Sequence, residues 1–170
     1  NVDKHYLADP DQLELLPGAA RGLKKLRALH IPLIIVTNQS GVARGYFGEE
    51  DVHRVNRRLL QLLEEEGITL DGVYYCPHGT EEGCPCRKPQ TGMLEAASRD
   101  LQLDGKKVIV IGDKKTDVDL AHNADGIALL VRTGKGNRYA DDPECRPAAV
   151  VDDLLCAADW IEWNLSQKLV

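Results

Sequence analysis

The sequence lacks the features of membrane, fibrous and disordered chains. Its 170 residues contain no apolar run near the roughly 18 residues that a bilayer span needs. The first five residues lack the apolar stretch of a secretory signal, and we find no internal repeat, low-complexity tract or linker. Because 43% of the residues are apolar, the chain can build a sizeable core. We therefore expect one soluble globular domain over residues 1–170.

The sequence also has no excess of positive charge. The chain carries 21 basic and 27 acidic residues, which give a net charge of −6. Nucleic-acid backbones attract clustered Lys and Arg, so this balance argues against a general nucleic-acid partner. The lack of a long apolar run argues against a membrane partner. Any phosphate is therefore expected to be bound locally, as part of a small molecule.

Cysteines are few and unevenly spaced. Three of the five, Cys76, Cys84 and Cys86, lie within eleven residues, whereas a disulfide framework would spread pairs along the chain. Together with His78 they offer three thiolates and one imidazole, a donor set that closes a tetrahedral Zn²⁺ shell. The predicted zinc is therefore structural. The alternative is free cysteines, a chance histidine and a loop disulfide. Cysteines that stay reduced favour a cytoplasmic protein. We also expect the protein to be a monomer.

Short apolar runs alternate with amphipathic segments, a pattern typical of α/β folds with a parallel sheet. Strands are predicted over residues 33–36, 73–75, 108–111 and 128–131. Helices are predicted from Pro17 to about residue 30, over 49–66, after Thr91 and Gly92, from a cap at Thr116, and over about 154–169. In the last helix, Trp160 and Trp163 are expected to pack in the core.

Polar residues follow two of the predicted strands, where ligands collect in open α/β sheets. Residues 37–41, with the sequence TNQSG, offer hydroxyls, amides and turn N–H groups that can hold a phosphoryl oxygen; a helix-capping loop is the alternative. Asp113 ends the other strand and is a candidate ligand for Mg²⁺, which prefers carboxylates and water. Asp117 is equally explained as a first-turn residue favoured by the helix dipole.

Arg87 and Lys88 directly follow the last predicted zinc ligand. A guanidinium can grip a phosphate as a bidentate fork, and an ammonium can act as a point charge. An ordinary solvated basic pair is the alternative.

These elements, in this order, resemble the haloacid dehalogenase superfamily of phosphohydrolases, and within it the zinc-loop branch of heptose bisphosphate and histidinol phosphate phosphatases. Residues 33–45 resemble its second motif, residues 75–89 its zinc loop and third motif, and residues 110–117 its fourth. The resemblance implies a Rossmannoid three-layer sandwich with a mainly parallel central sheet, a small zinc-binding loop and no large cap domain. It also implies a Mg²⁺-dependent phosphatase acting on a sugar phosphate, with the heptose branch the better match.

The resemblance implies roles for the matching residues. Thr37 and Lys88 would stabilise the transferring phosphoryl group, Asp113 would hold Mg²⁺, and Lys114 would lie beside metal and substrate, with its backbone a possible metal ligand. Zinc would be held by Cys76, His78, Cys84 and Cys86. The substrate-binding residues would be Thr37, Asn38, Gln39, Ser40, Arg87, Lys88 and Lys114, with Asp3, Lys4, His5 and Tyr6.

One motif of the superfamily is missing from the sequence. The first motif, an apolar strand ending in Asp-x-Asp-x-Thr, would supply the nucleophile and the general acid and would precede Asn1. The two Asp-x-Asp pairs, at residues 9–11 and 117–119, do not follow apolar strands. We therefore name no nucleophile among the 170 residues and expect it in an upstream segment. Without one, the chain would be a non-catalytic, zinc-stabilised phosphosugar-binding domain.

Overall fold

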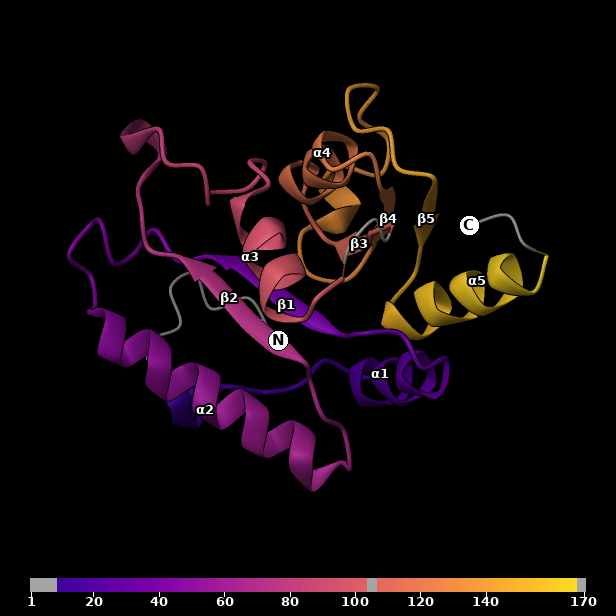
Figure 1. The fold of residues 1–170 in the computed structure, drawn as a ribbon, viewed down its shortest axis with the longest axis horizontal. Coiled ribbons are helices and arrows are strands. Elements are labelled where there is room, and N and C mark those ends of the chain that lie inside the picture. The colour runs from indigo at the N-terminus through magenta and orange to yellow at the C-terminus, as the bar shows by residue number, and fades with distance from the viewer. Residues whose placement is uncertain (1–8, 104–106, 168–170) are drawn as a thin grey trace. The chain divides into compact units, whose positions relative to one another are not determined.

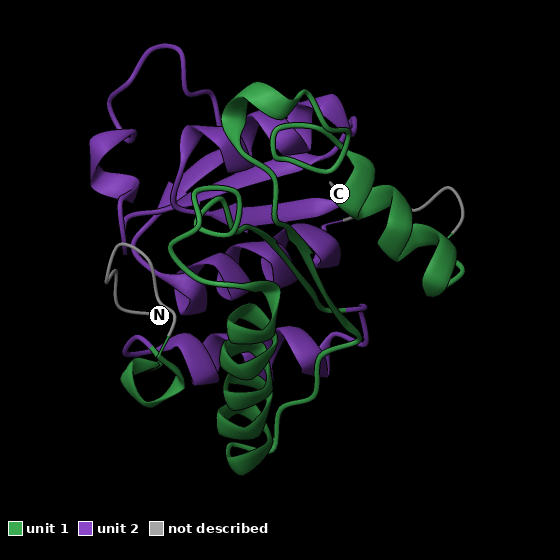
Figure 2. Cartoon of the chain, turned by 90° about the vertical axis from the view of Figure 1, so that its left-hand side faces the viewer, with its two compact units in different colours: residues 1–15, 33–106 green, residues 16–32, 107–170 purple. Residues whose placement is uncertain are grey.

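The computed structural model describes residues 9–103 and 107–167 (Figure 1). The chain divides into two compact units, residues 1–15 with 33–106 and residues 16–32 with 107–170 (Figure 2). Each unit combines parallel strands with helices. The α/β class with parallel strand pairing is therefore confirmed. No helix of the described ranges is long and apolar enough to cross a membrane.

The described part of the first unit contains two parallel strands, β1 (Ile34–Asn38) and β2 (Gly72–Cys76). Its α-helices are α2 (Glu49–Glu65) and α3 (Gly92–Asp100), and its short 3-10 helices are η1 (Pro10–Gln12) and η2 (Thr80–Glu82). The register places Asn38 beside Cys76, so the two strands end together. The loop after β1 therefore starts next to the cysteine-rich segment after β2.

The helix α2 forms where its apolar residues recur at helical spacing. It buries Val52 and Leu63, and Gly48 at its start donates its N–H to the Asp51 carboxylate over 2.8 Å. The helix ends before Gly67, whose φ of +70° suits a residue without a Cβ. Its two ends match the prediction over residues 49–66 closely.

The second unit, as far as residue 167, contains three parallel strands in the order β3 (Ile109–Gly112), β4 (Ile127–Val131) and β5 (Ala149–Val151). Its helices are α1 (Ala19–Ala28), α4 (Lys115–Asn123), α5 (Leu154–Ser166) and the 3-10 helix η3 (Gly136–Arg138). The central strand β4 is the most buried, with Leu129 and Leu130 at most 1% exposed. This burial explains why its apolar run is nearly continuous.

Helices α1 and α5 lie side by side (Figure 1). A Cβ added at Gly22 would lie 2.7 Å from the backbone carbonyl carbon of Leu154, so the glycine permits a close approach of the two helices. Lys25 bridges them at the surface, with Nζ 2.6 Å from Asp159 and 2.7 Å from Glu162.

Two sequence predictions about helices are wrong. The N-cap of α4 is Lys114 rather than Thr116, because the buried Asp117 carboxylate accepts the Lys114 N–H over 3.1 Å and starts the helix earlier. Trp163 is 60% exposed rather than packed in the core. The inward face of α5 is instead made of Ala157, Ala158, Ile161 and Asn164, while Trp160 is half-buried.

Candidate active site and metal centre

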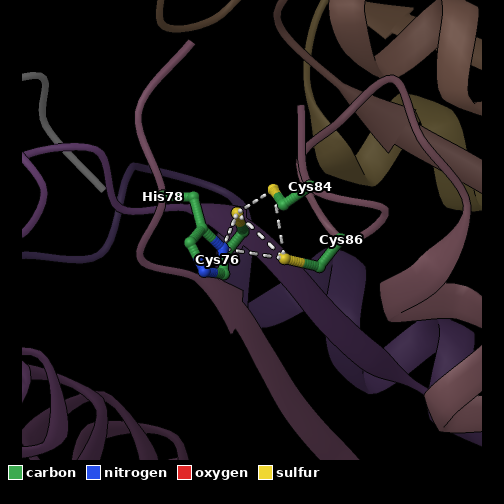
Figure 3. A group of neighbouring side chains, drawn as sticks. All are labelled: Cys76, His78, Cys84 and Cys86. Carbon is green, nitrogen blue, oxygen red and sulfur yellow. Dashed lines mark hydrogen bonds between the residues drawn. The ribbon is translucent and has the colours of Figure 1, made fainter. Parts of the chain in front are cut away.

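Four predicted zinc ligands come together at the end of β2 (Figure 3). Cys76 is the last residue of the strand and is fully buried, and His78 follows two residues later. Cys84 and Cys86 lie between η2 and α3. All four side chains point toward one another, and their donor atoms lie within 4.8 Å of each other.

The distances within this cluster fit a tetrahedral zinc ion. The three Sγ–Sγ distances are 3.2 Å (Cys76–Cys86), 3.5 Å (Cys76–Cys84) and 3.5 Å (Cys84–Cys86). His78 Nδ1 lies 3.5 Å from the sulfur of Cys76 and 3.3 Å from that of Cys86. Zinc–sulfur bonds of about 2.3 Å in a tetrahedron set sulfurs about 3.8 Å apart, close to these values. All four cysteine and histidine donors can therefore hold a metal ion, and the three cysteines are free thiols.

The thiols of the metal-free cluster differ in acidity. Burial, with the Cys86 thiol as hydrogen-bond partner, raises the pKa of Cys76 to about 12. At Cys84 burial acts in the same upward sense, but hydrogen bonds with Cys86 and Cys76 outweigh it and lower the pKa to about 7. Burial raises the pKa of Cys86. Near neutral pH the cluster therefore offers one thiolate, and a metal ion must displace the other protons.

The two cations that follow the cluster are held by the backbone of the same unit. Arg87 Nη1 donates to the carbonyl oxygen of His78 over 3.1 Å, which holds the guanidinium against residues 76–86, the segment with the four ligands that we call the ligand loop. Lys88 Nζ donates to the carbonyl oxygen of Val36 over 2.9 Å, which brings the ammonium to β1. Both side chains are half-buried. Arg87 and Lys88 are therefore not the ordinary solvated basic pair that the sequence left as an alternative.

Asn38 fastens Lys88 to the end of β1. Its Oδ1 accepts the Lys88 N–H over 3.0 Å, and its Nδ2 donates to the Lys88 carbonyl oxygen over 3.1 Å. The side chain amide thus pairs with a backbone peptide as a neighbouring strand would. The sequence predicted a substrate contact for Asn38 and missed this bridge, because the two residues lie fifty positions apart.

The loop after β1 is closed by its own backbone and by the segment after β2. Gln39 donates its N–H to the Cys76 carbonyl oxygen over 2.7 Å, and its Nε2 lies 3.3 Å from Thr37 Oγ1. The Ser40 carbonyl oxygen accepts the Arg44 N–H over 3.2 Å. Gly41 is buried against the ring of Phe47, where a Cβ would lie 2.3 Å from a ring carbon. Thr37, Gln39 and Ser40 are thereby held at the strand end, beside the ligand loop.

In the second unit, Asp113 follows β3 directly. One carboxylate oxygen, Oδ2, accepts the Lys135 N–H over 2.8 Å. In the described part of the chain Oδ1 accepts no hydrogen bond, and the residue is half-buried. A carboxylate oxygen that accepts no hydrogen bond suits Mg²⁺, which takes one or two protein carboxylates and fills its shell with water and phosphate oxygens. Lys114 is exposed beside it.

Asp117, whose role the sequence left open, caps the start of α4. Its side chain is 5% exposed, and it accepts the Lys114 N–H at the start of α4. A Cβ on Gly112 would lie 2.3 Å from the Asp117 Cβ, so the glycine makes room for this carboxylate. Asp117 therefore shapes the turn that carries Asp113 and Lys114.

Relatives of known name match most of the chain. The D-glycero-beta-D-manno-heptose-1,7-bisphosphate 7-phosphatase of Pasteurella multocida is 40% identical over 143 residues, covering 79% of this chain and 77% of that protein. The D-glycero-D-manno-heptose-1,7-bisphosphate 7-phosphatase of Thermosynechococcus vestitus is 36% identical, covering 99% and 93%. The chain belongs to the heptose-1,7-bisphosphate 7-phosphatase family. The resemblance seen in the sequence is thus confirmed.

Further comparisons agree with this family. Residues 85–157 match the family model described as HAD-hydrolase-like. The crystal structure of the D,D-heptose 1,7-bisphosphate phosphatase of B. bronchiseptica, complexed with magnesium and phosphate, superposes with a TM-score of 0.85 at 29% identity. That match covers 95% of this chain and 91% of the other. The haloacid dehalogenase fold expected from the motifs is therefore shown.

Four predicted substrate-binding residues of this family member cannot be placed. Asp3, Lys4, His5 and Tyr6 lie outside the described residues, so their roles stay predictions.

Proposed function

We propose that this chain is a Mg²⁺-dependent phosphomonoester hydrolase that removes the C7 phosphate of D-glycero-D-manno-heptose 1,7-bisphosphate through an aspartyl-phosphate intermediate. One observation carries the proposal. Asn38 and Val36 fix the backbone and the ammonium of Lys88 at the carboxyl end of β1, beside a four-donor metal cluster. Relatives at 36–40% identity carry the name of this activity.

Thr37 and Lys88 would bind the phosphoryl group as it transfers. Phosphoryl transfer spreads negative charge over three equatorial oxygens, and fixed donors at those oxygens lower the barrier. An ammonium has three N–H donors, and the bond to Val36 that orients Lys88 uses one of them. The Thr37 hydroxyl lies on the same strand and would contribute a neutral donor.

Arg87 would recognise the substrate from the ligand loop, and Gln39 and Ser40 would contact it from the loop after β1. A guanidinium matches phosphate oxygens in a bidentate manner. Its bond to His78 fixes where this fork lies. The bisphosphate substrate has a second phosphate that such a fork can bind.

Two metals would serve different ends. Asp113 would hold Mg²⁺, with the Lys114 backbone beside it; the ion, when bound, neutralises charge on the phosphoryl oxygens. The cluster of three cysteines and His78 would hold Zn²⁺ with no open position, which makes it structural. Zinc would fix the segment carrying Arg87 and Lys88, since a displacement of about 1 Å in a catalytic group can cost on the order of a hundredfold in rate.

We assign the attacking carboxylate and the general acid to none of the 170 residues. The roles proposed for this chain's residues are therefore binding, charge stabilisation and metal ligation.

Phosphate release with Mg²⁺ tests the proposal, using protein expressed from its full coding sequence. We expect one phosphate per heptose 1,7-bisphosphate, with ³¹P NMR showing loss of the C7 signal. Lys88→Met should lower kcat by about 10²–10³, the cost typical of a lost donor at a developing charge. Lys25→Met, which removes two surface ion pairs between α1 and α5, is the matched control and should leave kcat unchanged.

Other outcomes would overturn the proposal. Turnover of histidinol phosphate but not of the heptose bisphosphate would place the chain in the neighbouring branch. Binding of the heptose bisphosphate without turnover would indicate a phosphosugar-binding domain.

The protein is further proposed to act as a cytoplasmic monomer. Its five cysteines are free thiols, as a reducing compartment would keep them. Size-exclusion chromatography with light scattering should give the mass of one chain, and a dimer mass would contradict this. Cell fractionation tests the compartment.

A further inference from the structure

A tight turn after β4 contacts the carboxylate that ends β3. The strands are parallel neighbours, with Gly112 in register with Leu130, so the segment after β4 emerges beside Asp113. There the Lys135 N–H donates to Asp113 Oδ2 over 2.8 Å. The contact therefore follows from the strand order of this unit.

Gly134 makes this contact possible. Its φ is +63°, in the left-handed region that favours glycine. A Cβ added there would lie 2.3 Å from Asp113 Oδ2 and 3.1 Å from Cγ. The carboxylate thus rests against a bare Cα, and any side chain at position 134 would push it away.

The turn itself has little freedom to move aside. Gly136 is buried, and a Cβ added there would lie 1.7 Å from the Val131 carbonyl oxygen. Its N–H donates to the Thr133 carbonyl oxygen over 3.1 Å. Because the turn is pressed onto the end of β4, its N–H at Lys135 is presented in a fixed direction.

We infer that the turn formed by Gly134 and Lys135 is a positioning element for the Mg²⁺-binding carboxylate of Asp113. The Lys135 N–H engages Oδ2 and fixes the rotation of the carboxyl group, which leaves Oδ1 to face the ion. Groups that orient a metal ligand in this way commonly change metal affinity or activity by about 10–100-fold when they are lost. The inference rests on the proposed function, because it takes Asp113 as the metal ligand.

Mn²⁺ binding tests this inference without using catalysis. Free Mn²⁺ gives an electron paramagnetic resonance signal that is lost on binding, so titration of the purified full chain yields a Kd. We expect Gly134→Ala to raise this Kd by at least about tenfold. Gly67→Ala is the matched control: its φ is +70°, yet a Cβ there meets nothing within 4 Å. Its Kd should equal that of the wild type.

A second pair of variants distinguishes the effect of the Lys135 N–H from the effect of Gly134. It also provides a test if Gly134→Ala does not fold. Lys135→Pro removes the donor; the φ there is −99°, whereas a proline ring holds φ near about −65°, so circular dichroism must show that this variant folds. Lys135→Ala keeps the N–H and removes only the side chain. We expect weaker Mn²⁺ binding for the proline variant alone, with circular dichroism unchanged in both.

The outcomes distinguish the inference from the proposed function. If the wild type binds Mn²⁺ and Gly134→Ala and Lys135→Pro bind it equally well, the positioning role is wrong while the proposed function stands. If Lys135→Ala weakens binding as much as Lys135→Pro, the side chain and not the N–H is responsible, which also overturns the inference. If the wild type shows no saturable Mn²⁺ binding, the metal role of Asp113 fails and the inference with it.

Discussion

Replacing Asn38 with Ala should separate a positioning role from a substrate-binding role. The variant loses two half-buried hydrogen bonds to the Lys88 backbone, of 3.0 and 3.1 Å. Each contributes about 0.5–1.5 kcal/mol net, so we expect a loss of about 1–3 kcal/mol in the free energy of unfolding. For a chain of this size the melting temperature falls by about 2–4 °C per kcal/mol. Urea unfolding monitored by circular dichroism measures the loss.

The same variant should lower kcat by about a hundredfold, because the Lys88 backbone is no longer fixed at the strand end and only the bond to Val36 still orients the ammonium. A double-mutant cycle with Lys88→Met reveals whether the two effects are linked. Methionine keeps the backbone groups that Asn38 binds, so the stability losses should add. The kcat losses should not add, since the ammonium that Asn38 positions is already gone.

Additive losses in kcat would refute this reasoning. They would show that Asn38 contributes to turnover without Lys88, as a direct substrate contact would. An unchanged free energy of unfolding in Asn38→Ala would refute the structural half, because the bridge would then add nothing to the fold.

Three further predictions concern the ligand loop. Cys84→Ser should weaken zinc binding by more than about tenfold while Cys156→Ser, outside the loop, leaves it intact; metal analysis after dialysis distinguishes them. Zinc binding should release about two protons at pH 8, from Cys76 and Cys86, and more as the pH falls through about 7, where Cys84 gains its proton. Zinc affinity should therefore rise with pH. Calorimetry in buffers of different ionisation enthalpy counts the released protons. Gly92→Ala should destabilise the loop by about 1–3 kcal/mol, because its Cβ would lie 2.6 Å from the Pro85 carbonyl oxygen. Gly48→Ala is the control, since its Cβ would meet only an atom 3.9 Å away. Zinc affinity measured by chelator competition should fall in the Gly92 variant alone.

Much of the fold could be predicted because buried strands have a strong apolar signal. The run at residues 128–131 is such a case, and it forms the buried strand β4. The strand β5 was missed, since Ala149–Val151 has three residues and too little pattern to detect. The start of α4 was misplaced because a buried Asp117, rather than Thr116, receives the first N–H. Such a contact depends on tertiary burial, which spacing does not reveal.

In the candidate site, too, local features could be predicted from the sequence and tertiary contacts could not. The four zinc ligands could be predicted because they lie in one short segment, so their chemistry and proximity are both visible in the sequence. The bridge from Asn38 to Lys88 and the turn at Gly134 could not, because each joins residues far apart in the chain. Their partners are backbone groups, which carry no sequence signal of their own.

The zinc ligands span only residues 76–86, and this short span has a consequence for how the protein loses its metal. Closing so small a loop restrains few residues, because loop-closure entropy grows with the length of chain enclosed. Strand pairing between β1 and β2 involves only Cys76 of this loop, and helix α2 lies outside it. Removing zinc should therefore melt a local segment while most of the unit stays folded. The fraction of molecules that are folded and the fraction that can turn over substrate then become separate quantities. Only the zinc content of a preparation reports the second fraction.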